Sequence, residues 1–446
     1  MTIPDPAGAA LDLSGSSSGS GSGMPRRGTV VGYRCATCGH EVEVDTVHPW
    51  RCPAAADGDH HHVLHPVVSG PDPQLLDDPN PFVAYGPSMA WWAFAQAHGM
   101  TDAQCVELAR EVADGFHVTP CGPHEQLAQR LGATPGQVWV KDETGNVGGS
   151  HKARHLVGIL MHLRAAEQLG LVGPAAGPAA ASRPPLAIAS CGNAAIAAAT
   201  LARRAAWPLQ VYVPDTVSDT VAGLLESLGA QLNRCPRVPG QLGDPAVLAF
   251  RAAVTAGAIP FSVQGPENGL CLDAARTLGW ELADALDTDP HDGPTRVLVQ
   301  VGGGALAACV GWGLGPSLRL DTVQTEGGAP LQRAWSRAGE VATDELGGRW
   351  SDLMTPWVDP HSLADGILDD ETYDWQADVA VMRACGGEPI VAPEAAVVAA
   401  YELATELGAA VSPTGSAGLA GLLPPTPGAG IREGERVVIL FTGVAR

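Results

Sequence analysis

The two lysines of the chain, Lys141 and Lys152, stand on either side of a glycine-rich segment, and every other member of the 26 basic residues is arginine. Arginine can take over most surface roles of lysine, but it cannot form a Schiff base, because its guanidinium group stays protonated. A chain that has almost eliminated lysine and keeps it at these two places therefore indicates a chemical role for one of them. The alternative is that the two lysines remain by chance.

Lys152 follows a tight turn over residues 148–150 and stands at the start of a predicted helix, in a stretch with helical spacing from His151 to Leu169. A Schiff-base lysine must be partly desolvated so that its amine is neutral at the working pH. A glycine turn at the start of a helix supplies a rigid and open platform for such an amine. The alternative is an ordinary surface lysine near a helix end.

Three consecutive glycines within residues 301–305 lie between a predicted strand and a predicted helix. Backbone N–H groups in such a turn converge on a phosphate group, aided by the helix dipole. A dinucleotide site is the alternative, since Gly302, Gly304 and Ala307 fit the spacing Gly-x-Gly-x-x-Ala and Asp321 follows. However, Asp321 starts the next predicted strand, whereas a ribose-binding acid should stand near the far end of that strand.

A third turn, residues 190–193 with the sequence Ser-Cys-Gly-Asn, also joins a predicted strand to a predicted helix. Asn193 could hydrogen-bond a phenolic oxygen there, and the exposed N–H groups could hold a carboxylate. The alternative is an ordinary helix cap, since Ser and Asn are favoured at that position.

These motifs occur in one order: Gly-Gly-Ser-His-Lys152, then Ser-x-Gly-Asn193 about forty residues later, then the triple glycine, then Thr442-Gly443. The ordered set, from about Thr119 to Arg446, resembles the fold-type II pyridoxal-phosphate (PLP) enzymes. That family includes threonine synthase, serine/threonine dehydratase, cysteine synthase and the tryptophan synthase β-subunit. Each motif alone is unspecific, and their order is what makes the resemblance specific.

The resemblance implies that Lys152 binds the cofactor as a Schiff base and later shuttles the substrate proton. Asn193 would contact the ring hydroxyl, and a hydroxyl of Thr442 or Thr414 would meet the pyridine nitrogen. The implied phosphate contacts are Gly302, Gly303, Gly304 and Ala305, with His151 as a further candidate. The implied substrate contacts are Ser190, Cys191, Gly192 and Asn193, with Arg154 matching an arginine of the synthases.

A neutral hydroxyl at the pyridine nitrogen leaves a weaker electron sink, which favours elimination and replacement over transamination. Threonine synthases usually show Ser-Phe-Lys-Asp-Arg where this chain has Ser-His-Lys152-Ala-Arg154, and the missing Asp weakens the assignment of Arg154. A His before the lysine resembles the tryptophan synthase β-subunit, whose substrate loop is not recognisable here.

We therefore expect a lyase that performs β-elimination or β-replacement on a small L-amino acid, similar to serine/threonine ammonia-lyases. Threonine synthase acting on O-phosphohomoserine is the first alternative. It would need a basic pocket for the substrate phosphate, and Arg154 is the one candidate for it in the sequence. A non-catalytic PLP-binding or amino-acid-binding protein is the second alternative.

Near the N-terminus, the knuckle Cys35-x2-Cys38 is followed by Cys52, but a second Cys-x2-Cys is absent. The pattern resembles a zinc ribbon in which His62 replaces the fourth thiolate, and a site of this kind would be closed and structural. Other candidates for the fourth ligand are His60, His61 and Asp57. The alternative is a loop with free thiols.

Alternation of strand and helix patterns predicts an α/β protein with two lobes and mostly parallel sheets flanked by helices. The expected organisation is a disordered arm (1–28), a zinc-ribbon-like module (29–68), a helical connection (69–118) and a PLP-binding domain (119–446), whose smaller subdomain spans about 150–235.

A net charge of −22 argues against general binding to nucleic acid, because such binding depends on Lys and Arg meeting phosphates. No apolar run reaches the roughly 20 residues that span a bilayer, and no signal peptide is evident. We expect a cytoplasmic homodimer whose partner is a small amino-acid substrate.

Overall fold

The structure of the protein, a computed structural model, describes residues 27–172, 183–238 and 243–446. The predicted N-terminal arm falls almost entirely outside these residues.

Three sheets form the framework. The N-terminal sheet has the order β2-β1-β3 and consists of β1 (Thr29–Cys35), β2 (Glu41–Glu43) and β3 (Leu64–Ser69). The largest sheet has the order β12-β11-β10-β13-β5-β4, with β4 (Cys121–Pro123), β5 (Val138–Asp142), β10 (Thr295–Gln300), β11 (Arg319–Thr325), β12 (Pro389–Ala392) and β13 (Arg436–Phe441). The third sheet has the order β8-β7-β6-β9, with β6 (Leu186–Ala189), β7 (Leu209–Pro214), β8 (Gln231–Cys235) and β9 (Ile259–Pro260).

Helices connect these strands. They are α1 (Pro81–Ala84), α2 (Ala90–Ala97), α3 (Asp102–Val112), α4 (Glu125–Arg130), α5 (Lys152–Gln168), α6 (Asn193–Arg204), α7 (Asp219–Ser227), α8 (Pro245–Thr255), α9 (Arg276–Thr288), α10 (Ala305–Leu314), α11 (Pro330–Ala338), α12 (Trp350–Leu353), α13 (Trp375–Cys385), α14 (Glu394–Glu406) and α15 (Pro413–Ser416). Short 3-10 turns are η1 (Gly86–Ser88), η2 (Val147–Gly149), η5 (Gly269–Leu272), η6 (Thr343–Glu345), η7 (Gly347–Arg349), η8 (Asp365–Ile367) and η9 (Ala417–Leu422).

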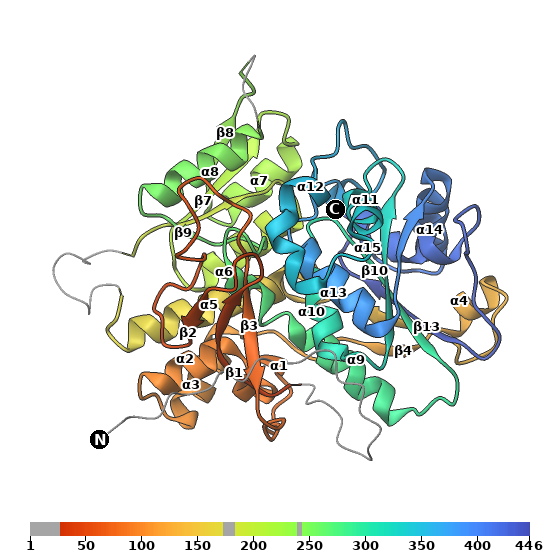
Figure 1. Cartoon of the computed structure of the whole chain (residues 1–446), viewed down its shortest axis with the longest axis horizontal. Coiled ribbons are helices and arrows are strands. Elements are labelled where there is room, and N and C mark those ends of the chain that lie inside the picture. Colours follow the sequence, from red (N-terminus) through yellow and green to blue (C-terminus); the bar gives the residue numbers. More distant parts are fainter. Residues whose placement is uncertain (1–26, 173–182, 239–242) are drawn as a thin grey trace.

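The strand pairs confirm the predicted fold class. All pairs of the four-stranded sheet are parallel, and in the six-stranded sheet only β4 pairs antiparallel, with β5. Parallel strands need helical crossovers, which cover both faces of such sheets. Figure 1 shows the two lobes side by side, with β7, β8, α7 and α8 in green and β10, β13 and α14 in the other lobe. The division of the chain at the predicted domain boundaries stays a prediction.

Helix α5 is largely enclosed, with 13 of its 17 residues buried. It packs against α2, α3 and α6. A helix buried to this extent is fixed by the side chains packed around it. Its first residue is Lys152, so the position of that side chain is fixed by the packing of the whole helix.

The N-terminal sheet is antiparallel and packs on the body of the protein through its third strand. Strand β3 contacts η5, and a Cβ atom at Gly269 would lie 2.9 Å from the Cβ atom of Leu64. Contact at this distance requires glycine, because a larger residue would displace the strand. The module is therefore packed directly onto the main body of the chain.

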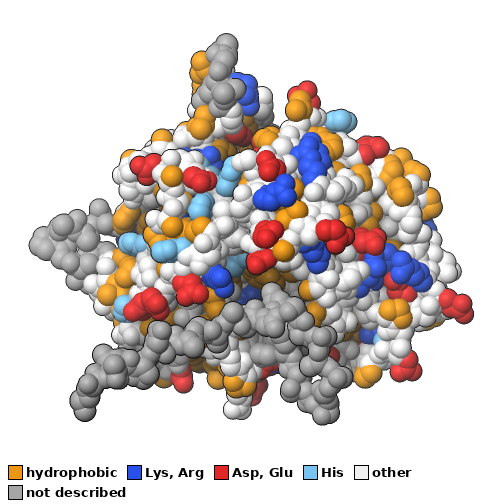
Figure 2. Space-filling view, viewed as in Figure 1, with side chains coloured by type: hydrophobic (Ala, Val, Ile, Leu, Met, Phe, Trp, Pro, Cys, Tyr) orange, Lys and Arg blue, Asp and Glu red, His pale blue; other side chains and the backbone are white. Residues whose placement is uncertain are grey.

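Acidic and basic side chains are interspersed over the face shown in Figure 2. Among the described residues, no helix is long and apolar enough to cross a membrane.

A buried network of charged side chains ties the largest sheet to two helices. Lys141 of β5 donates from Nζ to Glu281 Oε2 of α9 at 2.6 Å and to the carbonyl of Thr119 at 2.8 Å. Arg154 of α5 binds Glu143 through Nε at 2.8 Å and Glu281 through Nη1 at 2.6 Å. The side chains of all four charged residues are fully shielded from solvent.

Two opposing effects act on the carboxyl group of Glu143. Burial alone would raise its pKa, but the charge of Arg154, followed by that of Lys141, overcomes this and lowers the pKa to about 2. The pKa of Arg154 is raised in turn, because Glu143 and Glu281 more than offset its desolvation. Both partners of the pair are therefore charged throughout the physiological pH range.

We expect Lys141→Met to lower the free energy of unfolding by about 3–5 kcal/mol, because Glu281 would lose one of its two buried cationic partners. The matched control is Lys152→Met, which removes the other lysine of the chain from a place without an ion pair and should cost less than about 1 kcal/mol. Urea unfolding of the cofactor-free proteins measures both. Equal destabilisation by the two substitutions would contradict this account.

Candidate active site

The turn that precedes Lys152 depends on two glycines with left-handed backbone. Gly148 has φ +70° and Gly149 has φ +67°, a region in which residues with a Cβ atom are strained. A Cβ atom at Gly149 would also lie 2.7 Å from Val444 Cγ1. The turn is held against the C-terminal strand, since Ser150 forms an isolated β-bridge with Gly443. The glycines therefore let the chain pass close to the end of β13 before α5 begins.

A cavity of about 400 Å³ lies where the turns of both lobes meet. Lys152 opens into it from α5, together with the β6–α6 turn and the β10–α10 turn. Its wall includes all but one of the cofactor and substrate residues predicted from the sequence: His151, Lys152, Ser190, Cys191, Gly192, Asn193, Gly302, Gly303, Gly304, Ala305, Thr414 and Thr442. The structure thus brings together residues that lie up to 291 positions apart in the chain.

The amine of Lys152 has no hydrogen bond or ion pair within the part of the chain that the structure describes. Burial lowers its pKa, and the nearby carboxylates of Asp369 and Asp374 act in the opposite direction without cancelling that effect. A buried amine with a lowered pKa is more often neutral and nucleophilic at neutral pH. Such an amine is what a lysine that condenses with an aldehyde requires.

His151 is held by the end of the chain. Its backbone N–H donates to the carbonyl of Thr442 at 3.0 Å, and its Nδ1 lies 3.1 Å from the same oxygen. Burial, then the charge of Lys152, place its pKa well below the usual value, so the ring is neutral. Nε2 is buried without a partner among the described residues, and the ring lines the cavity. An unsatisfied buried nitrogen in this position points to a ligand group that would pair with it.

The glycine turn before α10 leaves no room for side chains. A Cβ atom at Gly302 would lie 2.9 Å from the Cα atom of Ile367, and one at Gly304 would lie 3.2 Å from the Cβ atom of Asp374. Gly304 also has φ +99° and occupies the N-cap of α10. Backbone N–H groups at the start of a ten-residue helix favour an anion, and the N–H of Gly303 already interacts with the carboxylate of Asp369. The turn, the unpaired amine and the unpaired imidazole together fit PLP.

The two rival hydroxyls differ in their hydrogen bonds. Thr442 Oγ1 accepts from Gln300 Nε2 at 2.8 Å, so its own proton is free to be donated. Thr414 Oγ1 accepts from the N–H of Gly366 at 2.9 Å and lies 3.4 Å from Asp365 Oδ1, to which it can donate. Gln300 was not expected from the sequence, because it reads as the last residue of a buried strand.

Arg154 does not lie where the sequence predicts it. Its guanidinium group is enclosed by Glu143 and Glu281 and is not part of the cavity wall. An arginine with five donors facing two buried carboxylates has none left for a substrate. The expectation that Arg154 contacts the substrate is therefore wrong. In this structure, Arg154 joins the first turn of α5 to Glu143 and Glu281.

Three acids beside the glycine turn were not predicted from the sequence. Burial raises the pKa of Asp369 to about 6 and that of Asp374 to about 8, and it places the pKa of Asp378 well above the usual value. Asp374 anchors the turn through its backbone, which donates to the carbonyl of Gly303 at 2.8 Å. In the sequence these acids resemble a solvated loop, and only the fold shows that their carboxyl groups are shielded from solvent.

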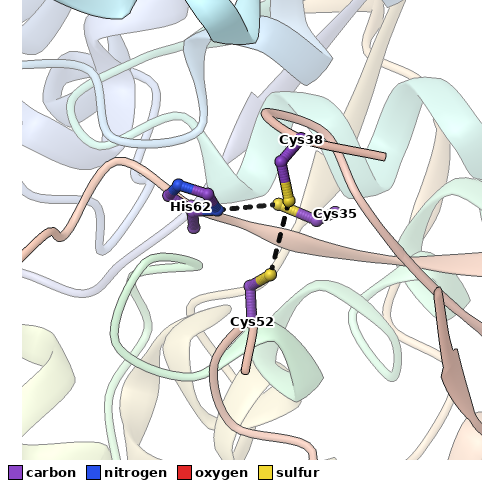
Figure 3. Close-up of side chains that lie close together, drawn as sticks. All are labelled: Cys35, Cys38, Cys52 and His62. Atoms are coloured by element: carbon purple, nitrogen blue, oxygen red, sulfur yellow. Dashed lines mark hydrogen bonds between the residues drawn. The ribbon is translucent and has the colours of Figure 1, made fainter. Parts of the chain in front are cut away.

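A second cluster lies in the N-terminal module. The ligand atoms of Cys35, Cys38, Cys52 and His62 all lie within 4.8 Å of one another, and Figure 3 shows the three sulfurs and the imidazole pointing toward one another. Cys38 Sγ lies 3.6 Å from Cys52 Sγ, and Cys35 Sγ lies 3.3 Å from His62 Nδ1. Tetrahedral zinc with Zn–S bonds of about 2.3 Å places its sulfurs about 3.8 Å apart.

Two of the three rival fourth ligands, His60 and His61, have other partners. His60 Nδ1 lies 3.3 Å from Glu267 Oε1, and the ring of His61 stacks on that of Trp350 with the ring centres 4.8 Å apart. Among the described histidines, cysteines, aspartates and glutamates, this cluster is the one group of three or more whose ligand atoms could share a metal ion.

Asp374 gives a test of the buried acids. With an unfolded pKa near 3.9 and a native pKa of about 8, the native state holds an extra proton between these values. Its contribution to stability is therefore present at low pH and is lost as the pH rises through 8. The amide of Asp374→Asn mimics the protonated acid. We therefore expect the Tm of this variant to decrease less between pH 6 and pH 9 than the Tm of the unaltered protein. The exposed Asp370→Asn is the matched control and should follow the unaltered protein. Parallel pH profiles for Asp374→Asn and the unaltered protein would refute the assignment.

Comparison with known proteins agrees with this geometry. Residues 112–443 match the family described as pyridoxal-phosphate dependent enzyme. Solved structures with a similar fold include the threonine deaminase from T.th., with 21% identity, 77% of this chain and 97% of that chain covered and a TM-score of 0.57. Maize serine racemase shows 18% identity, coverage of 76% and 92%, and a TM-score of 0.56. The L-serine ammonia-lyase from Rhizomucor miehei shows 18% identity, coverage of 74% and 94%, and a TM-score of 0.54.

No curated protein matches the sequence. At these identities the solved structures establish the fold. The family match covers most of the chain, and the protein belongs to the pyridoxal-phosphate dependent enzymes of fold type II.

Proposed function

We propose that the protein is a lyase that removes the α-proton and a β-substituent from a small L-amino acid, with β-replacement as the variant of the same chemistry. The observation that carries the proposal is the buried, unpaired amine of Lys152 in a cavity closed by a glycine turn suited to phosphate. Bound PLP would supply the electron sink that stabilises negative charge at Cα. The cytoplasmic location and the homodimer expected from the sequence remain predictions.

Lys152 would serve twice. Its neutral amine would hold the cofactor, and once released it would take the α-proton, since it is the one lysine in the cavity wall. A general base works best when its pKa lies near the working pH. Burial moves the pKa of Lys152 in that direction.

Thr442 is the better candidate for the hydroxyl that donates a hydrogen bond to the pyridine nitrogen of the cofactor. Because its oxygen accepts from Gln300, its proton is free to point into the cavity. The hydroxyl of Thr414 has Asp365 as an acceptor instead. A neutral donor at the ring nitrogen would limit the electron sink and favour elimination over transamination.

The β6–α6 turn would bind the substrate carboxylate. Its N–H groups open at the start of α6, a helix of 12 residues, and helix N-termini favour anions. Asn193 Oδ1 accepts from Arg446, which leaves the amide N–H2 of Asn193 as a donor. We propose that this group meets the ring hydroxyl of the cofactor.

The cavity argues against threonine synthase. A phosphorylated substrate needs cationic side chains, and Lys152 is the one Lys or Arg among the described residues that line the cavity. Arg154, the candidate from the sequence, is paired with two glutamates outside the wall. A lyase acting on an unphosphorylated amino acid therefore fits the site better.

We further propose that Cys35, Cys38, Cys52 and His62 bind one zinc ion in a closed, structural site. All four ligand atoms face a common centre, and no position is left for a substrate when four protein ligands surround zinc. The metal would tie the loop that carries Cys35 and Cys38 to Cys52 and His62.

For the lyase, we expect the purified protein with PLP to be yellow and to release ammonia and a keto acid from one member of an amino-acid panel. The panel contains serine, threonine, their O-acetyl and O-phospho forms, and O-phosphohomoserine. Lys152→Ala should be colourless and slower by about 1,000-fold or more, whereas Lys141→Arg should stay yellow. A protein that binds no PLP would end the proposal, and a yellow protein inert on every amino acid would favour a sensor.

For the metal, we expect elemental analysis to find one zinc per chain and chelation to lower the Tm. Cys35→Ser should lose the zinc, because a hydroxyl is a poor zinc ligand compared with a thiolate. Cys121→Ser, which alters a cysteine of β4 outside the cluster, is the control and should retain it. Metal-free protein with unchanged thermal stability would show that the cluster is a set of free thiols.

A further inference from the structure

The glycine turn before α10 carries a carboxylate of the chain itself. Asp369, in the loop that follows η8, lines the cavity. Its Oδ2 atom lies 2.5 Å from the position that a Cβ atom would take at Gly302 and 3.6 Å from that position at Gly303. The N–H of Gly303 interacts with this carboxylate. The space that the glycines leave over the turn is therefore partly taken by an acid.

A phosphate group at this turn needs the same backbone N–H groups. Phosphates at the start of a helix are held by the N–H groups of its first turn, and a phosphate monoester carries a charge of about −1.5 to −2 at pH 7. An ionised Asp369 would repel it. When two anionic groups share a site, the pKa of one of them is strongly raised. Either the carboxylate leaves the turn, or it takes up a proton and stays.

The loop that carries Asp369 is tied to the turn on both sides of this residue. Before it, the Cα atom of Ile367 lies 2.9 Å from the Cβ position of Gly302. After it, the backbone N–H of Asp374 donates to the carbonyl of Gly303 at 2.8 Å. The backbone thus holds the acid over the turn, which favours protonation in place over withdrawal.

The surroundings of Asp369 already bring it close to neutrality. Burial raises its pKa to about 6, and the charge of Asp370 acts in the same direction, whereas Lys152 of α5 and a backbone N–H act against them. Asp374 and Tyr373, which lead into and begin the approach to α13, face the same carboxylate. Burial holds the pKa of Asp374 at about 8 and that of Tyr373 well above its usual value, so both are mainly neutral at pH 7. Lys152 is therefore the one side-chain cation among these groups.

We propose that Asp369 is a further contact of the cofactor phosphate, and that it takes up one proton from solvent when the phosphate group binds at the glycine turn. Its O–H then donates to a phosphate oxygen, and hydrogen bonds from O–H to an ionised oxygen are among the strong ones. This inference rests on the proposed function in one respect, the assignment of the glycine turn to the phosphate. It holds for any reaction at Cα.

The sign of the pH dependence follows from this proton. Above its pKa of about 6, Asp369 is mainly ionised before binding, and a phosphate monoester has passed its second pKa near 6 by pH 7. Binding then requires one extra proton. By linkage, the affinity for the phosphorylated ligand should fall by about tenfold for each unit that the pH rises between 7 and 8.

The test uses pyridoxine 5'-phosphate, which has the ring and the phosphate but no aldehyde and so cannot condense with Lys152. Titration calorimetry at pH 8, in two buffers with different ionisation enthalpies, counts the protons taken up. We expect about one proton for each molecule bound by the unaltered protein. Asp369→Asn should take up about one proton fewer and bind tighter at pH 8 by about tenfold or more, because its amide donates without needing that proton.

Two controls separate Asp369 from its neighbours. Asp370→Asn removes an exposed carboxylate from the next position and should follow the unaltered protein. The amine of Lys152 titrates as well, so the count is repeated in Lys152→Ala. The uptake should persist in Lys152→Ala and be lost in Lys152→Ala/Asp369→Asn.

Equal proton uptake by the unaltered protein and Asp369→Asn would overturn the inference and leave the lyase function standing. Binding of pyridoxine 5'-phosphate without proton uptake by the unaltered protein would do the same, and this measurement needs no variant. Asp369→Ser, which also removes the charge, replaces Asp369→Asn if that variant does not fold. A protein that binds neither PLP nor pyridoxine 5'-phosphate would refute the proposed function together with this inference.

Discussion

The buried ion network beneath α5 is the interaction on which the rest of the site depends. Lys141, Glu143, Arg154 and Glu281 link β5, α5 and α9 through contacts of 2.6 to 2.8 Å. Desolvating four charges is costly, and the network is tolerable only because each charge faces an opposite one. Arg154 stands two residues after Lys152, so the network fixes the first turn of α5. The two lysines thus have opposite roles, one locked in an ion pair and one left free.

The wall of the cofactor cavity is continuous with the N-terminal module. Val63, which precedes β3, approaches Gly265, where a Cβ atom would lie 2.7 Å from its Cγ1 atom. The N–H of Gly265 reaches Asp374 Oδ2 at 3.4 Å, and the backbone of Asp374 holds Gly303. The knuckle itself contacts α13, because Thr37 accepts from Gln376 at 3.3 Å. The N-terminal module, which the sequence suggests is separate from the catalytic domain, therefore contacts the residues that hold the glycine turn of the cavity.

The sequence predicts the fold and the positions of the main motifs well, because both follow from local patterns. Helix α5 begins at Lys152, directly after the glycine turn and within one residue of the predicted start. The knuckle cysteines and His62 also meet as their spacing suggests. Periodicity and glycine placement are local properties, so they survive without knowledge of tertiary contacts.

What the sequence could not supply are contacts between distant residues. Arg154 was matched to a substrate arginine, yet one of its partners, Glu281, lies 127 positions away. Gln300, whose hydrogen bond leads us to favour Thr442 over Thr414, lies 142 positions from Thr442. The burial of Asp369 and Asp374 follows from how their segment folds over the glycine turn, and the sequence around them is polar.

The amine that we propose as the nucleophile is made more neutral by burial, which lowers the pKa of Lys152. Many lysines that must be neutral stand beside another cation, which repels the proton. Lys152 faces Asp369 and Asp374 instead, and these would favour its charged form. Burial prevails over both, and the acids are themselves held closer to neutrality by the same burial. Lack of further cationic residues among the described lining residues therefore does not weaken the case for an amine nucleophile.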